Sequence, residues 1–239
     1  MKLIYETTYR MRTNDFTCYD TLSPTSILDS FQDAAGTHAS LLGMGFDDML
    51  EKGYYWVVFR EKVTILGSVR PGETVKCLTW PEKKKGVSFI RNYKMLNEAG
   101  EVVAVGSSLW VVISVSTRRL ERARDVNYDG EIVEETIYPT LDKLAEKEIN
   151  SNFIPYEVKF RDLDHNKHMN NSKYMDVFLD ILDLKKEEKI KSFQLDFIHE
   201  AKEKDIINIK YVKENNIYYF EGYINDTLAI RAEIEVTNA

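Results

Sequence analysis

Residues 161–182, RDLDHNKHMNNSKYMDVFLDIL, place a dense group of polar side chains immediately before an amphipathic helix. A histidine such as His168 can act as an acid, a base or a polarising group near neutral pH. Asp164 can fix the orientation of that histidine, and Asn166 can donate a hydrogen bond to a substrate carbonyl. One of the two asparagines that follow can cap the helix, whose free N–H groups and positive dipole end favour an oxyanion. The pattern fits a metal-free hydrolytic site.

A calcium loop is the first alternative explanation. Asp162, Asp164 and Asn166 match the first three ligand positions of an EF-hand. That loop then needs a glycine and, at its twelfth position, a bidentate glutamate. Lys167 and Lys173 occupy these two positions, so the sequence excludes calcium binding of this type.

Two further explanations involve the same side chains. His165 and His168, with or without His199, are spaced so that a transition metal can bind, but no further Cys/His pair supports one. We therefore expect no metal and no cofactor. A capping loop whose polar groups only satisfy one another is the other explanation, and these residues alone leave it as open as hydrolysis.

The elements that must position this segment occur twice along the chain. In the first half, the strand LIYETTYRMR leads through an irregular stretch to a helix with Ser23 as N-cap and Pro24 in its first position. In the second half, the strand FIPYEVKF leads through the polar segment to a helix with one apolar face. That face carries Tyr174, Val177, Phe178, Ile181 and Leu182.

A run of strands follows each helix. The first run comprises YYWVVFREKVTIL, ETVKCLTW, GVSFIRNYKML and VVAVGSSLWVVISV, and the second comprises SFQLDFIHE, IINIKYV, NIYYFEGYI and TLAIRAEIEV. This order predicts an α+β fold in which antiparallel sheet wraps around one long helix, twice over. We expect a first repeat over 1–125, a linker over 126–150 and a second repeat over 151–239. Thr140 is positioned to cap a short helix in an otherwise solvated linker.

The polar segment closely resembles the acyl-acyl carrier protein thioesterases. The signature of that family is D-x-N-x-H followed by V/M-N-N and a helix that bears an aromatic residue. Residues 164–171 read DHNKHMNN, Tyr174 lies in the helix, and the resemblance covers nearly the whole chain, including GYYWVVFREKVTI. It implies a double hotdog fold and hydrolysis of the thioester of fatty acyl-acyl carrier protein, with Asp164, Asn166 and His168 as catalytic residues.

The resemblance also implies a further acid in the strand after the helix, immediately before a position that is often cysteine. The matching segment LDFIHEAKEKD makes the acid Glu200 and places Ala201 at the cysteine position. A Cys–His–Asn scheme is thereby excluded, so we expect an activated water with Glu200 as its general base and His168 holding or polarising it. Strict alternation along SFQLDFIHE places His199 and Glu200 on opposite faces, with His199 outside the site.

The first repeat lacks this chemistry. Aligning the two helices places Thr17, Tyr19 and Thr21 opposite the catalytic positions, and the equivalent of Glu200 falls near Ser68. None of these replacements supplies a suitable base. The resemblance implies that the first repeat lines the acyl pocket instead. The candidate lining residues, each equally explained by core packing, are Ile27, Phe31, Ala35, Trp56, Val58 and Trp110.

Composition limits the partners. With 239 residues and a net charge of -7, the chain lacks the basic surface that general nucleic-acid binding needs. An acidic carrier protein must therefore dock on a local basic surface. The better candidate is STRRLERAR, and PEKKKG is more simply a solvated turn. The docking candidates are Arg118, Arg119, Arg122 and Arg124.

The remaining expectations concern location and alternatives. No apolar run is long enough to span a membrane, the first residues lack the features of a targeting segment, and Cys18 and Cys77 are predicted to be reduced thiols. We expect a cytoplasmic protein, with a homodimer possible through exposed sheet edges. The alternative functions are an acyl-coenzyme A thioesterase and a non-catalytic acyl-binding or dehydratase-like hotdog protein.

Overall fold

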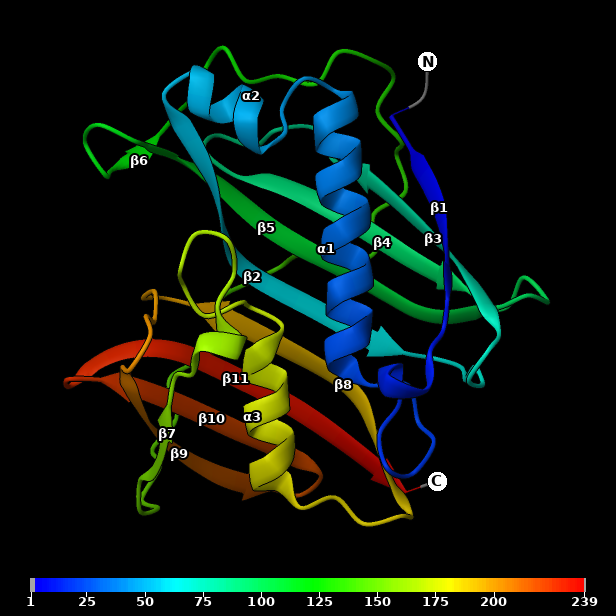
Figure 1. Ribbon diagram of the computed structural model, residues 1–239, viewed down its shortest axis with the longest axis vertical. Helices are drawn as coiled ribbons and strands as arrows, with labels where there is room; N and C mark the ends of the chain where they lie inside the picture. Colours follow the sequence, from blue (N-terminus) through cyan, green and yellow to red (C-terminus); the bar gives the residue numbers. More distant parts are fainter. Residues whose placement is uncertain (1–2, 239) are drawn as a thin grey trace. The chain divides into compact units, whose positions relative to one another are not determined.

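The computed structural model describes residues 3–238, and its strands and helices group into two units (Figure 1). The N-terminal unit comprises the residues up to Leu22 together with Ser26–Leu141. The C-terminal unit comprises Ser23–Thr25 together with the residues from Asp142 onward. Within the described part of the chain, no helix is both long and apolar enough to cross a lipid bilayer.

The N-terminal unit is an antiparallel sheet against one long helix. The strand order is β1-β3-β4-β5-β2, and the short β6 pairs with β5. The strands are β1 (Tyr5–Arg10), β2 (Tyr54–Ile65), β3 (Thr74–Pro81), β4 (Phe89–Leu96), β5 (Val102–Ser114) and β6 (Leu120–Glu121). The helices are the 3-10 turn η1 (Thr13–Asp15), α1 (Pro24–Leu41) and α2 (Phe46–Glu51). Helix α1 begins at Pro24, as the sequence predicted.

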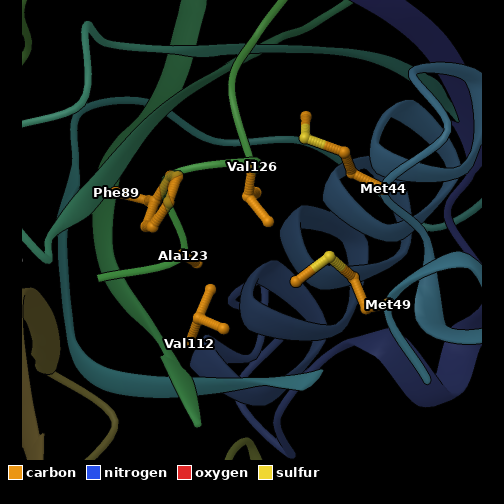
Figure 2. Close-up of a cluster of buried hydrophobic side chains, with 6 residues drawn as sticks. All are labelled: Met44, Met49, Phe89, Val112, Ala123 and Val126. Carbon is orange, nitrogen blue, oxygen red and sulfur yellow. The ribbon is translucent and has the colours of Figure 1, made fainter. Parts of the chain in front are cut away.

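Helix α1 lies across one face of this sheet and buries its apolar side there (Figure 1). The ring of Phe31 stacks on the ring of Tyr93 in β4, with 4.7 Å between the centroids. Gly106 of β5 lies directly beneath Phe31, so the absence of a side chain at Gly106 makes room for the ring. A second buried cluster lies near α2 (Figure 2), and its members are Met44, Met49, Phe89, Val112, Ala123 and Val126.

The C-terminal unit repeats the plan with a shorter helix. Its antiparallel strands lie in the order β8-β11-β10-β9-β7. They are β7 (Ile154–Glu157), β8 (Glu188–Phe197), β9 (Ile206–Glu214), β10 (Ile217–Ile224) and β11 (Thr227–Asn238). The 3-10 turn η2 (Phe160–Asp162) precedes helix α3 (Lys173–Leu182). Phe178 of α3 packs on Phe220 of β10 with 4.6 Å between ring centroids, so the predicted apolar face of the helix covers the sheet.

Residues 126–150, predicted to form a solvated linker with a short helix, are neither helical nor simply solvated, which corrects the sequence interpretation. No helix begins at Thr140. The Trp80 indole N–H donates to the carbonyl of Glu135 at 2.7 Å in the N-terminal unit. In the C-terminal unit, Leu144 N–H donates to the Asp196 carboxylate at 2.8 Å. Because strand side chains satisfy these backbone groups and Leu141 is buried, the segment is an extended strap on the sheets.

Two glycine substitutions test the packing of α1 on its sheet. A Cβ at Gly106 would lie 2.8 Å from Phe31 Cε2 and 3.1 Å from the carbonyl oxygen of Lys62. We expect Gly106→Ala to lower the free energy of unfolding by about 1–3 kcal/mol, the usual cost of overpacking. A Cβ at Gly36, on the exposed side of α1, would meet no atom within 4 Å, so Gly36→Ala should raise it by about 0.5–1 kcal/mol. Denaturant unfolding of both variants measures the difference, and equal effects would contradict this packing.

Candidate active site

The polar segment predicted to carry the chemistry forms a loop closed at its base by Asp162. The buried Asp162 carboxylate accepts hydrogen bonds from the Tyr156 hydroxyl and the Lys159 N–H, each at 2.7 Å. Burial and the bond to Asp162 raise the pKa of Tyr156 to about 12, so this hydroxyl remains a donor. The carbonyl of Asp162 accepts the Asn170 N–H at 2.7 Å. The residues between Asp162 and Asn170 are therefore held as one closed loop.

Asp164 organises the interior of this loop. Its Oδ1 accepts the backbone N–H of Asn166 at 2.8 Å and that of His168 at 3.1 Å, and its Oδ2 lies 3.4 Å from the Asn166 side-chain nitrogen. The chain turns through Lys167, whose φ is +64°. An aspartate that bonds to backbone N–H groups further along the chain stabilises such a turn. Asp164 thus orients the Asn166 amide directly, but it holds His168 through the main chain and not through the imidazole.

Glu200 reaches the loop from just beyond β8. The N–H groups of Ile198 and His199 both donate to the carbonyl of Ala229, at 2.9 and 3.0 Å, so regular strand pairing stops there. The alternation argument for His199 and Glu200 therefore does not apply, and both side chains are exposed. The Ala201 carbonyl then accepts the Met169 N–H at 2.8 Å. This bond joins the segment that carries Glu200 to the polar loop.

The result is a close contact between an imidazole and a carboxylate. His168 Nε2 lies 3.3 Å from Glu200 Oε2, and the two side chains are 24% and 44% exposed. Water can therefore reach both groups. The Asn166 side chain, whose amide nitrogen lies 3.4 Å from Asp164 Oδ2, is exposed in the same loop as His168. A carboxylate and an imidazole in contact are suited to hold a water molecule and take its proton.

The start of α3 supplies fewer free donors than the sequence predicted. Ser172 is the N-cap of α3, and the side-chain oxygen of Asn170, two residues earlier, accepts the Ser172 N–H at 3.2 Å. The Asn170 carbonyl accepts the Lys173 N–H at 3.0 Å. With the N–H groups of Asn170, Ser172 and Lys173 all occupied, the Asn166 side chain is the better placed donor for an oxyanion.

The N-terminal unit contains the same loop without the chemistry. Thr17 N–H donates to the Thr21 carbonyl at 2.8 Å, the same distance that joins Asp164 N–H to the His168 carbonyl. Instead of a carboxylate that orders the turn, the Thr17 and Thr21 hydroxyls bond to each other at 2.7 Å. Leu66 and Gly67 N–H both donate to the Val103 carbonyl, as Ile198 and His199 do to Ala229. This correspondence places Ser68 opposite Glu200, in the register that the sequence alignment predicted.

The candidate acyl-lining residues all belong to the N-terminal unit. Ile27, Phe31 and Ala35 are buried on α1, and Val58 is buried on β2. Trp56 and Trp110 are partly buried and pack against the cluster of Figure 2.

The four docking arginines Arg118, Arg119, Arg122 and Arg124 are all exposed, around β6 and the loop after it. Sequence reasoning missed the role of Lys84, which lies in the supposed solvated turn PEKKKG. Its ammonium group donates to the carbonyls of Arg122 and Ala123 at 2.7 and 2.6 Å and lies 4.6 Å from the Phe89 ring centre. Burial lowers the pKa of Lys84. A lysine flanked by two others in an apparent turn gives no sequence signal for this contact. The hydrogen bonds from Lys84 restrain the loop that carries Arg122 and Arg124.

Comparison with known proteins identifies the family. The chain matches the acyl-ACP thioesterase N-terminal domain over residues 2–130 and the acyl-ACP thioesterase C-terminal domain over residues 145–237. It belongs to the acyl-ACP thioesterase family. The match spans both units.

Among curated relatives, the chloroplastic palmitoyl-acyl carrier protein thioesterase of Cuphea hookeriana is 27% identical over 189 residues, covering 72% of this chain and 45% of the relative. The protein of the same name from Arabidopsis thaliana is 26% identical over 219 residues, covering 83% of this chain and 52% of the relative. The chain therefore spans about half the length of the curated relatives it matches.

Two solved structures share the fold along their full length. An acyl-ACP thioesterase from Bacteroides thetaiotaomicron superposes with a TM-score of 0.91 at 20% identity, covering 98% of each chain. The 12:0-ACP thioesterase from Umbellularia californica gives a TM-score of 0.83 at 21% identity, covering 99% of this chain and 98% of that one. The predicted α+β double hotdog fold is confirmed.

The role of Asp164 in ordering the loop can be tested by amide hydrogen exchange. Hydrogen bonds to charged groups contribute about 1.5–3 kcal/mol, so Asp164→Ala should accelerate exchange at Asn166 and His168 by about tenfold or more. Thr17→Ala, in the corresponding loop of the N-terminal unit, is the matched control and should leave both amides unchanged. Unaltered exchange in Asp164→Ala would show that the turn forms without its carboxylate.

Proposed function

We propose that this chain hydrolyses the thioester of fatty acyl-acyl carrier protein to a free fatty acid and the carrier-protein thiol. The observation that carries the proposal is the 3.3 Å contact between His168 Nε2 and Glu200 Oε2, and His168 shares its loop with an amide that Asp164 orients. Membership of the acyl-ACP thioesterase family supports the substrate class. The two relatives from Cuphea hookeriana and Arabidopsis thaliana are named for action on the palmitoyl-acyl carrier protein.

In the proposed mechanism, water is the nucleophile. Glu200 removes a proton from a water molecule that His168 holds, and the hydroxide adds to the thioester carbonyl carbon. The Asn166 amide donates to the oxyanion of the tetrahedral intermediate, and Asp164 keeps that amide in place. When the carbonyl re-forms, the C–S bond breaks and the departing thiolate takes the proton that Glu200 removed. The fatty acid and the thiol are then released.

The positions of the thiols support water over a cysteine nucleophile. Ala201, buried beside Glu200, carries no thiol. Cys77 is buried in the N-terminal unit, and burial raises its pKa to about 12, so it remains protonated. Cys18 is exposed in the corresponding loop of the N-terminal unit, and that N-terminal loop contains no histidine. Both cysteines are free, which supports a reducing compartment such as the cytoplasm.

We infer that the carrier protein docks on the exposed arginines around β6. The chain has a net charge of -7, so an acidic partner needs a local region of opposite charge. Arg122 and Arg124 lie in the loop that Lys84 secures through the carbonyls of Arg122 and Ala123. Because these hydrogen bonds already restrain the loop, its arginines lose little conformational entropy when a partner binds.

Replacing Glu200 tests the chemistry. Glu200→Gln keeps the size of the side chain but removes the base, so kcat on fatty acyl-acyl carrier protein should fall by about 100-fold or more. Glu203→Gln, an exposed neighbour, is the matched control and should be unaffected. Assaying the corresponding acyl-coenzyme A esters in parallel measures the preference for the carrier. Near-normal turnover by a folded Glu200→Gln variant would remove Glu200 from the mechanism, and equal kcat/KM on both esters would remove the carrier-protein assignment.

Reversing the charge of the docking surface tests the partner. The double variant Arg122→Glu/Arg124→Glu should raise KM for the carrier-protein ester by about tenfold at low salt, with little change in kcat. Lys186→Glu/Lys189→Glu, two exposed lysines of the C-terminal unit, changes the net charge equally and should leave KM unchanged. Kinetics at low and high salt distinguish the two variants. The same rise in KM for both would mean that only net charge matters.

A further inference from the structure

A row of buried polar side chains crosses the face of the N-terminal sheet that α1 covers. Glu61 of β2 lies opposite Ser108 of β5, and Ser108 lies opposite Arg91 of β4. The three residues are only 5%, 1% and 5% exposed. The Tyr93 hydroxyl and the Trp110 indole both bond to Ser108 Oγ, at 2.7 and 2.6 Å, so the row lies inside the unit.

The rows on either side are made of apolar and aromatic residues and a glycine. One contains Val58, Trp110 and Phe89, and the other contains Val63, Gly106 and Tyr93. Val58 and Trp110, together with Phe31 over Gly106, are among the residues proposed to line the acyl chain. A chain that contacts both sets of lining residues must therefore pass the polar row.

Glu61 is an incompletely satisfied buried carboxyl. Its Oε2 is buried, and no residue within 3–238 offers it a hydrogen bond. Burial, followed by the negative charge of Asp29 on α1, raises the pKa of Glu61 to about 8. The side chain is thus a neutral acid near pH 7, with an O–H to donate and a carbonyl oxygen to accept.

Arg91, at the other end of the row, is buried without a carboxylate partner among the described residues. Its guanidinium bonds to His38 Nδ1 at 3.0 Å and to Thr79 Oγ1 at 3.3 Å. Burial and the charge of Arg91 lower the pKa of His38 to about 4, so that imidazole is neutral and accepts the bond. A guanidinium has five N–H donors, and the Tyr128 hydroxyl is a further hydrogen-bond partner of Arg91.

Such an arrangement is costly for a pocket that holds only a hydrocarbon chain. A buried polar group without a partner destabilises the folded protein, and an apolar side chain of similar shape avoids that cost. We propose that Glu61, with Arg91 across Ser108, forms a polar subsite in the acyl pocket that selects fatty acyl chains bearing a hydroxyl or oxo group along the chain. This inference rests on the proposed function, because it assumes that the N-terminal unit holds the acyl chain.

The chemistry of the row fits either substituent. The Glu61 O–H donates to an oxo group, and its carbonyl oxygen accepts from a hydroxyl. Arg91 donates to the oxygen of either group. An unsubstituted methylene chain would bury Glu61 Oε2 with its hydrogen-bonding capacity still unused. Discrimination by a site built to bond an oxygen substituent is strong for this reason.

The test compares acyl-acyl carrier proteins of one chain length that carry no substituent, or a hydroxyl or oxo group at successive positions. For the wild-type protein, we expect kcat/KM at the best position to exceed that of the unsubstituted ester by tenfold or more. Glu61→Leu should abolish this preference and improve turnover of the unsubstituted chain, and Glu61→Gln should retain part of it. Equal ratios in the wild-type protein and Glu61→Leu would overturn the proposal, as would a Glu61→Leu effect on chain length alone.

A binding measurement separates this proposal from the proposed function. Free fatty acids with and without the substituent are titrated calorimetrically against the wild-type protein and Glu61→Leu. Tighter binding of the substituted acid by the wild-type protein alone supports the subsite even if no ester is hydrolysed. Hydrolysis of unsubstituted esters without any such difference in affinity would overturn the subsite and leave the thioesterase assignment intact.

The protonation state of Glu61 has an independent readout. Between about pH 4.5 and 8 the folded protein holds a proton on Glu61 that the unfolded chain has lost, so the folding equilibrium constant falls by up to tenfold per pH unit as pH rises. Glu61→Gln lacks this fall. The groups that face Glu61 are Asp29 on α1, Tyr93 and Arg91 on β4, and Ser108 on β5. Identical pH dependence of unfolding in both proteins would show that Glu61 is ionised and would overturn recognition through its O–H.

Discussion

The arrangement of the candidate active site depends on an antiparallel β-bridge between His168 and Lys202, which includes the hydrogen bond from Met169 N–H to the Ala201 carbonyl. It joins a loop ordered by local contacts to a segment that only the sheet can position. Without it, nothing in the loop fixes the distance between His168 and Glu200, which are 32 positions apart in the sequence. General acid–base chemistry needs its groups within hydrogen-bonding reach, and a backbone bond restrains them at little cost in side-chain entropy.

The duplication shows how a fold can retain a loop and lose its chemistry. Both units close the same turn with the same backbone bonds, and each anchors it with a buried aspartate, Asp15 or Asp162. What differs is the set of side chains that the turn presents, threonines in one unit and an Asp–Asn–His set in the other. The backbone is therefore a stable scaffold in its own right, and the chemical function resides in a few side chains placed on it.

Buried polar groups divide into two kinds in this protein. Backbone groups of the strap bond to polar side chains of the strands, as the Leu144 N–H does to the Asp196 carboxylate. These side chains therefore hold the strap in place. The row of Glu61, Ser108 and Arg91 is different, because part of its hydrogen-bonding capacity is left unused inside an apolar interior. Polar groups of the first kind are explained by the fold, and those of the second kind call for a ligand.

The sequence by itself determined the features that depend on neighbouring residues. The start of α1 at Pro24, the order of elements in the two repeats, and the grouping of Asp164, Asn166 and His168 in one loop all follow from residue type and spacing along the chain. The 3.3 Å distance between His168 and Glu200, the extended strap in place of a helix at Thr140 and the contacts of the Lys84 ammonium group were decided only by the tertiary structure. Each requires the pairing of distant strands, and strand register arises from the packing of a whole sheet rather than from any local pattern.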